Sequence, residues 1–130
     1  MIALIVALVA GPAEPPKNHR LAMAIFFEES SGRLNPPPGD GGKAIGPMQI
    51  WKITVDDANR ILRENRFTYA DRLDLERSVE IFWIVSDHYC RHFRDWSDEG
   101  RARRWNRGPD RKKWEDRHGT IYWNKVKKWL

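Results

Sequence analysis

The chain has 130 residues, the size of one domain, which is long enough to bury a hydrophobic core without covalent support. Its hydrophobic content of 41% with 12% aromatic residues excludes a wholly disordered chain, and its single cysteine, Cys90, excludes an intrachain disulfide. The net charge of +5 and the isoelectric point near 9.6 indicate an acidic partner, such as nucleic acid, an anionic membrane surface or an anionic polysaccharide.

The N-terminal residues 1–10 form an apolar run that is too short to span a bilayer. The run resembles the hydrophobic region of a secretory signal, although the first lysine is Lys17 and a basic start is missing. An uncleaved interfacial anchor and a packed N-terminal element are the alternatives. Prolines in residues 11–16 predict a spacer. We therefore expect a signal or hydrophobic segment with a spacer over 1–16, a folded domain over 17–130, and a secreted, periplasmic or cell-envelope location.

Apolar periodicity predicts a first helix over about residues 17–31, because Leu21, Ile25 and the aliphatic part of Glu29 recur every four residues. Gly32 is suited to end this helix.

A Pro/Gly-rich stretch follows the first helix. Residues 33–44 hold three consecutive prolines and three glycines, which predict a loop, and loops of this length in compact domains tend to be functional. Pro47 suits the first turn of a helix, and Thr54 or Asp56 could cap a further helix through Leu62.

After a break at residues 67–71, the strongest helical pattern in the chain starts at Asp74 and continues to about Arg94 with an apolar stripe. We expect it to form the central helix. Ser97 is expected to cap a short helix over residues 98–105.

The C-terminal part of the chain contains a predicted turn at residues 106–109 and a predicted helix that starts at Gly119 and ends at Leu130. No strand pattern of any length is present. The chain is therefore predicted to fold as a mainly α, small single domain of several irregularly packed helices with one long Pro/Gly-rich loop.

Two acidic side chains suit the cleavage of a glycosidic bond. Glu29 ends the first helix beside apolar residues 25–27, and an apolar setting at the negative end of a helix raises the pKa of a carboxyl group. Asp40, flanked by glycines in the loop, is the candidate for the second carboxylate that this chemistry uses. The residue types alone also allow Glu28 and Glu29 to be a solvated helix end.

Several sequence blocks, in the same order as in the family, resemble the lysozyme-like superfamily, which includes soluble lytic transglycosylases. They are similar to its A-I-x-x-E-S, N-P, G-L-M-Q-I, H-N-G-G-P and Y-W-N-K-V motifs. The stretch around Asp40 is closer still to the invertebrate-type (destabilase) lysozymes and shares a Gly-Asp with the goose type. The matching blocks are residues 24–30, 35–36, 39–50, 102–109 and 120–126.

The resemblance implies a lysozyme-like fold with a catalytic domain over residues 17–130 and the Pro/Gly-rich stretch as its active-site loop. It implies that Glu29 is the general acid and that Asp40 occupies the second acidic position, whose role differs between subfamilies. It also implies a sugar cleft lined by polar and aromatic side chains. These substrate-binding positions are Ser30, Gln49, Trp105, Asn106 and Tyr122.

The chain departs from the family pattern at three points. The loop between Glu29 and Asp40 carries three consecutive prolines and does not fix the separation of the two carboxyl groups, which leaves retaining, inverting and transglycosylase outcomes open. Invertebrate-type lysozymes are rich in disulfides, whereas this chain has one cysteine, so packing must hold the framework. Arg107 replaces a glycine of the N-G-G-P motif and alters the expected turn.

Other clusters suggest different functions. His88, Cys90 and His92 lie on the predicted long helix, but Cys90 points away from the two histidines and no second cluster completes a metal site, so we expect no metal and no cofactor. Residues 101–130 carry eleven Lys or Arg against three acidic residues, together with four of the seven tryptophans. This segment is either a solvated basic surface or a cationic wall for a polymeric ligand.

The sequence therefore predicts a monomeric muramidase (lysozyme) that cleaves the β-1,4 bond between MurNAc and GlcNAc in peptidoglycan by carboxylate general acid catalysis. A lytic transglycosylase acting on the same bond is the nearest alternative. A non-catalytic basic module that binds nucleic acid or cell-wall polymer is the alternative of another class. We expect attraction to anionic cell-wall polymers and no specific nucleic-acid partner.

Overall fold

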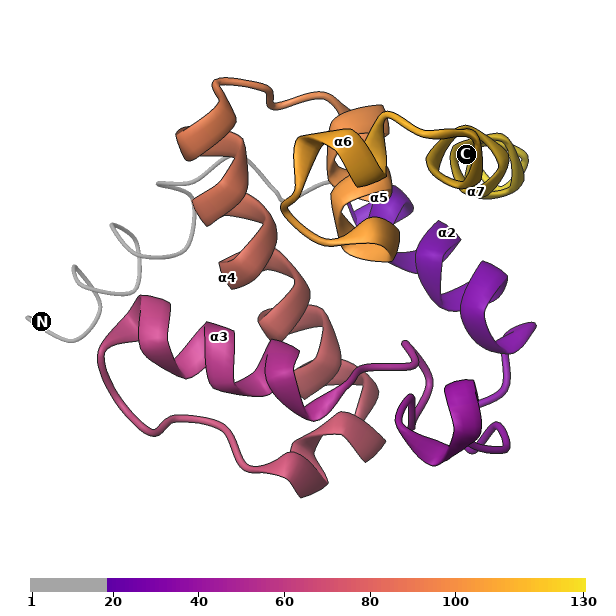
Figure 1. Ribbon diagram of the computed structural model, residues 1–130. Helices are drawn as coiled ribbons and strands as arrows, with labels where there is room; N and C mark the ends of the chain where they lie inside the picture. The colour runs from indigo at the N-terminus through magenta and orange to yellow at the C-terminus, as the bar shows by residue number, and fades with distance from the viewer. Residues whose placement is uncertain (1–18) are drawn as a thin grey trace, which may run out of the picture.

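Six α-helices and two short 3-10 helices make up the regular structure of residues 19–130, which are the residues that the computed structural model describes (Figure 1). The predictions for residues 1–16 and for the start of the first helix lie outside the described residues. The helices are α2 (His19–Ser30), η1 (Asp40–Gly42), α3 (Lys52–Leu62), η2 (Tyr69–Leu73), α4 (Leu75–Phe93), α5 (Asp98–Arg107), α6 (Arg111–Trp114) and α7 (Arg117–Lys127).

The prediction of a mainly α, small single domain is confirmed. Between residues 19 and 130 the extended structure is confined to two isolated β-bridges, both in the segment between α2 and α3. No helix in this part of the chain is both long and apolar enough to cross a membrane.

Helix α4 runs through the middle of the molecule, as predicted (Figure 1). The Asp74 carboxylate caps it by accepting a hydrogen bond from the backbone N–H of Glu76, and Arg94 ends it in a left-handed conformation. Helices α3 and α5 both pack against α4, and α7 packs against α2 and α5. The fully buried Phe82 of α4 lies in the core that these helices share. The central helix thus supports both walls of the space between α3 and α5.

Helix α5 also begins where its cap predicts. The Ser97 hydroxyl accepts a hydrogen bond from the backbone N–H of Gly100 at 3.0 Å, and the helix continues beyond the predicted end to Arg107. The predicted turn at residues 106–109 is therefore shifted, with Gly108 as the C-terminal cap.

The prediction of a helix at Pro47 is wrong. Residues 46–49 form a turn closed by the bridge between Ile45 and Ile50, and α3 begins only at Lys52, so neither Thr54 nor Asp56 caps it. Gly46 and Gln49 have φ of +80° and +51°, which are not helical, and backbone hydrogen bonds between Ile45 and Ile50 close the turn. Gly46 also packs closely against another segment. A Cβ atom on Gly46 would lie 1.8 Å from the backbone oxygen of Arg72, which is a contact that local sequence cannot reveal.

The C-terminal region also differs from the prediction. Helix α7 starts at Arg117 rather than Gly119, because the Asp116 carboxylate caps it by accepting a hydrogen bond from the backbone N–H of Gly119, and α7 ends at Lys127. The one-turn helix α6 was not predicted. Asp110 caps it through the N–H of Lys112.

Candidate active site

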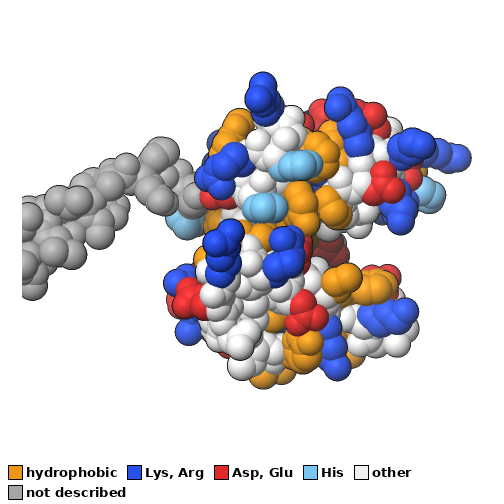
Figure 2. Space-filling model, turned by 60° about the vertical axis from the view of Figure 1, so that its left-hand side comes forward, with side chains coloured by type: hydrophobic (Ala, Val, Ile, Leu, Met, Phe, Trp, Pro, Cys, Tyr) orange, Lys and Arg blue, Asp and Glu red, His pale blue; other side chains and the backbone are white. Residues whose placement is uncertain are grey.

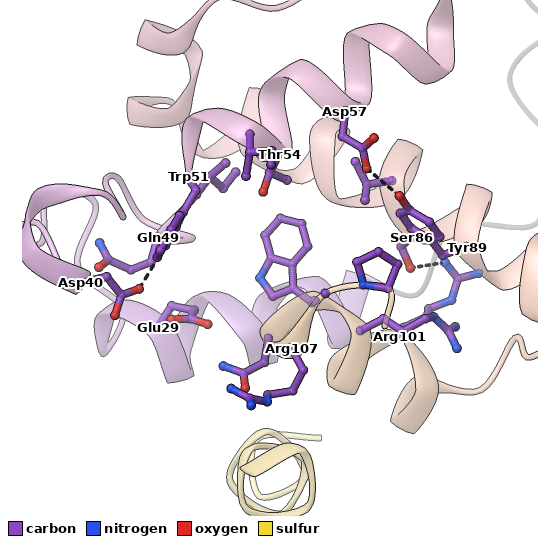
Figure 3. Close-up of a pocket in the computed structure, with 18 of the residues that line it drawn as sticks. Glu29, Asp40, Gln49, Trp51, Thr54, Asp57, Ser86, Tyr89, Arg101 and Arg107 are labelled. Atoms are coloured by element: carbon purple, nitrogen blue, oxygen red, sulfur yellow. Dashed lines mark hydrogen bonds between the residues drawn. The ribbon is translucent and has the colours of Figure 1, made fainter. Parts of the chain in front are cut away.

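A cleft of about 540 Å³ lies between the segment that follows α2, together with α3, on one side and helices α4 and α5 on the other. Figure 3 shows Glu29, Asp40 and Gln49 together at one end of the cleft and Ser86, Tyr89 and Arg101 at the other. The cleft therefore extends from Glu29 and Asp40 at one end toward α4 and α5 at the other.

Glu29 projects into the cleft from the last turn of α2 and is partly buried. The pKa of its carboxyl group is raised from the ordinary 4.5 to about 7, chiefly because a charged carboxylate loses hydration on burial. The negative charges of Glu28 and Asp40 contribute smaller increases to this value. Glu29 thus keeps a transferable proton up to neutral pH, which is the property that a general acid needs.

Tyr122 of α7 forms a hydrogen bond with this carboxyl group. Its hydroxyl donates a hydrogen bond of 2.9 Å to Oε1 of Glu29, and this bond opposes the effect of burial by lowering the pKa of Glu29. Burial and the neighbouring negative charge of Glu29 raise the pKa of Tyr122 well above 10, so the hydroxyl remains a donor. The bond joins residues from opposite ends of the chain and fixes the direction of the acid.

The neighbouring Glu28 faces a different environment. Its Oε2 accepts a hydrogen bond of 3.1 Å from the indole N–H of Trp129, and Glu28 does not line the cleft. Because the two adjacent carboxylates are separated in this way, Glu29 is the one on α2 that can reach a ligand in the cleft.

Asp40 reaches the cleft from a tight turn between the two bridged residues Gly39 and Ala44. Its backbone is left-handed, with φ of +50°, and its side chain is exposed. The indole N–H of Trp51 donates a hydrogen bond of 3.0 Å to Oδ2 of Asp40. The glycines on both sides of Asp40 thus form a turn that presents a carboxylate toward Glu29 and the cleft.

Gln49 lies beside Asp40 and lines the same end of the cleft. Its amide nitrogen donates a hydrogen bond of 3.0 Å to the backbone oxygen of Gly46. A Cβ atom on Gly39 would lie 2.5 Å from Oε1 of Gln49, so a larger residue than glycine would displace this amide.

The opposite wall is built from the end of α5. Trp105 and Asn106 both line the cleft, and the Trp105 ring packs edge-on against Phe82 with ring centroids 5.1 Å apart. Since Phe82 is fully buried in α4, the position of the Trp105 ring is set by the core.

Two of the residues expected to bind substrate do not line the cleft. Ser30 is buried, and its hydroxyl donates a hydrogen bond to the backbone oxygen of Phe26. Tyr122 is also buried and contacts Glu29 as described above. The structure therefore brings five of the predicted site residues together around one cleft, and Tyr122 contacts Glu29 from outside the cleft lining. The five are Glu29, Asp40, Gln49, Trp105 and Asn106.

The cleft also contains residues that the sequence did not reveal. The far end is lined by Tyr89, which donates a hydrogen bond to Asp57, and by Arg101, which donates to Ser86 and Asp87. Trp51 was also not predicted, and the only signal is its place directly after the Gly-Pro-Met-Gln-Ile block. These residues lie on separate helices and segments that only the fold brings together.

The residues that suggested a metal site, His88, Cys90 and His92, do not form one in the part of the chain that the structure describes. Within residues 19–130, no three side chains of the His, Cys, Asp and Glu types gather to hold a metal ion. Cys90 is buried, and its Sγ lies 3.1 Å from Nη2 of Arg104.

Part of the basic segment is paired with acidic side chains. Figure 2 shows Lys and Arg on both parts of the surface that a hollow separates. Five arginines of the basic segment form ion pairs within 4.0 Å. These pairs are Arg101–Asp87, Arg103–Glu99, Arg104–Asp95, Arg107–Asp116 and Arg111–Glu115.

Comparison of the chain with protein-family models, with curated proteins and with solved structures gives no match. The geometry of the cleft and the chemistry of its residues are therefore the basis for a functional proposal.

Proposed function

We propose that this protein is a muramidase that cleaves the β-1,4 bond between MurNAc and GlcNAc in peptidoglycan, with Glu29 as the general acid. The observation that supports this most strongly is the carboxyl group of Glu29, which lies in a long cleft with its pKa raised to about 7. The resemblance of the sequence blocks to the lysozyme-like superfamily supports a lysozyme-like fold and the same chemistry.

In the proposed reaction, the protonated Glu29 gives its proton to the glycosidic oxygen while the bond from that oxygen to the anomeric carbon breaks. Positive charge then develops on the sugar ring, and the Asp40 carboxylate stands beside Glu29 to act on it. Asp40 can do so as a nucleophile, as an electrostatic stabiliser or by orienting water. Tyr122 holds the acid in one direction.

The remaining wall residues suit a glycan. Sugar rings present apolar C–H faces, which stack on aromatic rings such as those of Trp51 and Trp105, and hydroxyl groups, which bond to amides such as those of Gln49 and Asn106. The net charge of +5 suits attraction to the anionic cell wall, and the proposed substrate implies action in the cell envelope or outside the cell.

The ion pairs of the basic segment reduce the charge that a nucleic-acid module would need. An arginine that is paired with a carboxylate has less charge to offer to phosphates, and five of the eleven Lys and Arg residues in this segment are paired in this way.

The proposal is tested by the clearing of a peptidoglycan suspension. Glu29→Gln should lower the clearing rate by about 10²- to 10⁴-fold, which is the usual contribution of a general acid. Glu28→Gln is the matched control, because it changes the adjacent carboxylate, which lies outside the cleft. Because the charge of Glu28 contributes to the raised pKa of Glu29, the comparison is made at about pH 5, where Glu29 is protonated in both proteins and Glu28→Gln should clear at close to the wild-type rate. Equal clearing by wild type and Glu29→Gln would refute the catalytic assignment.

Asp40→Asn separates the two enzymatic alternatives. A large loss of clearing is expected for a hydrolase that uses the second carboxylate, whereas full activity would favour a lytic transglycosylase, which uses Glu29 as acid and then as base.

A further inference from the structure

Trp51 connects the second carboxylate to the wall of the cleft. Its indole N–H donates a hydrogen bond of 3.0 Å to Oδ2 of Asp40, drawn as a dashed line in Figure 3. Trp51 is the N-terminal cap residue of α3, and its own side chain makes no capping hydrogen bond. The hydrogen bond of this side chain is thus made to Asp40 and not to the helix.

Asp40 needs such a partner to keep one direction. Its side chain is exposed, and it lies on a turn between Gly39 and Gly41, where its own backbone is left-handed. A carboxylate on an exposed turn has several accessible rotamers, and a hydrogen bond to a charged acceptor is strong enough to select one of them. The bond from Trp51 selects the rotamer that is seen beside Glu29.

The ring of Trp51 also offers surface to a ligand. The residue lines the cleft and remains 39% exposed, although Nζ of Lys43 lies 5.2 Å from the ring centroid. The N–H of the indole is used at one edge and Lys43 lies over one face, which leaves the other face to stack against the C–H groups of a sugar ring.

We infer that Trp51 positions Asp40 through its N–H group and binds a sugar ring through its face, so that one side chain aligns the second carboxylate with the bound glycan. This inference rests on the proposed function and adds to it a positioning residue and a sugar subsite next to the reacting bond.

Two substitutions separate the two roles. Trp51→Phe keeps an aromatic face and removes the donor, so kcat on soluble peptidoglycan glycan strands should fall about tenfold with KM nearly unchanged. Trp51→Leu removes both features and should also raise KM about fivefold. In a Glu29→Gln background, calorimetric titration with a GlcNAc–MurNAc tetrasaccharide should show weaker binding for Trp51→Leu only.

The chain provides a matched control in Trp129. Its indole N–H also donates to a carboxylate, that of Glu28, and it is 52% exposed, but it does not line the cleft. Trp129→Phe should leave kcat and KM at wild-type values. A melting temperature close to that of wild type for each variant shows that the fold is intact.

A double substitution tests whether Trp51 acts through Asp40. If it does, adding Trp51→Phe to Asp40→Asn causes no further loss of the residual kcat. Wild-type kinetics for Trp51→Phe, or the same tenfold loss in both backgrounds, would overturn the positioning role, and unchanged binding by Trp51→Leu would overturn the subsite. If Glu29→Gln clears peptidoglycan as wild type does, it is the proposed function that fails.

Discussion

The protonation of Glu29 depends on two opposing contributions from its surroundings. Burial raises the pKa of the carboxyl group and the hydrogen bond from Tyr122 lowers it, and the balance places the value at about 7. Because the general acid must carry its proton, activity should be lost as the pH rises through about 7. The hydroxyl of Tyr122 therefore holds the alkaline limb of the pH profile at a lower pH than burial alone would give.

Replacing Tyr122 by Phe should move this limb. The substitution removes the hydrogen bond that stabilises the ionised form, so the pKa of Glu29 rises and the alkaline limb of kcat/KM shifts to higher pH. Tyr69→Phe is the matched control. The Tyr69 hydroxyl also donates to a carboxylate, that of Asp56, but neither Tyr69 nor Asp56 lines the cleft, so the alkaline limb should stay in place. A limb that stays in place or moves to lower pH in Tyr122→Phe would contradict this account of the acid.

At the scale of the elements, the turn at residues 46–49 carries Gln49 and leads to Trp51, and Gly46 makes this turn feasible. Its φ is +80°, and its backbone lies against the segment around Arg72. The position of two cleft residues thus depends on a close backbone contact with η2.

Gly46→Ala should therefore destabilise the protein strongly. The added Cβ atom would lie 1.8 Å from the backbone oxygen of Arg72, so we expect a loss of about 3 kcal/mol or more in the free energy of unfolding, measured by urea denaturation. Gly41→Ala is the control, because Gly41 also has positive φ but has open space around it, and it should lose only about 1–2 kcal/mol. Equal losses for the two variants would mean that the contact with Arg72 does not matter.

The elements that the sequence predicts well are those whose signals are local. Asp74 and Ser97 cap α4 and α5 through backbone groups two and three residues away, and both helices begin where these residues indicate. Pro47 misled the prediction, because Gly46 and Gln49 on either side of it have positive φ and form a turn, and Gly46 packs against the backbone of Arg72, which is distant in sequence. The apolar neighbours of Glu29 made it a candidate acid, and the resemblance of the sequence blocks selected it. Its bond to Tyr122 and the approach of Trp51 to Asp40 exist only in the folded chain.

For the whole molecule, a buried acid with a raised pKa lowers stability. The folded state holds the Glu29 proton more tightly than the unfolded state does, so stability decreases as the pH rises from about 4.5 to 7 and the full cost is present above 7. This is the expected conflict between a catalytic group and the stability of the fold.

Glu29→Gln should consequently stabilise the protein at neutral pH. The neutral amide avoids the cost of ionisation, so we expect about 1–3 kcal/mol of additional stability at pH 8 and no gain at pH 4, measured by urea denaturation at both pH values. Glu28→Gln serves as control and should gain much less stability at pH 8, because the charge of Glu28 is a smaller cause of the raised pKa of Glu29 than burial is. A gain for Glu29→Gln that is the same at pH 4 and pH 8 would show that ionisation of Glu29 is not its origin.

The central claim is that the cleft cleaves the glycan backbone of peptidoglycan with Glu29 as acid, and mass analysis of the released muropeptides tests it most directly. The account predicts soluble fragments that end in reducing MurNAc from the wild type and Glu28→Gln, and none from Glu29→Gln. Fragments with anhydro ends would agree with Glu29 as the acid but would show that the reaction is transglycosylation and not hydrolysis. Glycan strands left intact by the wild type, or cleaved equally by Glu29→Gln, would contradict the account.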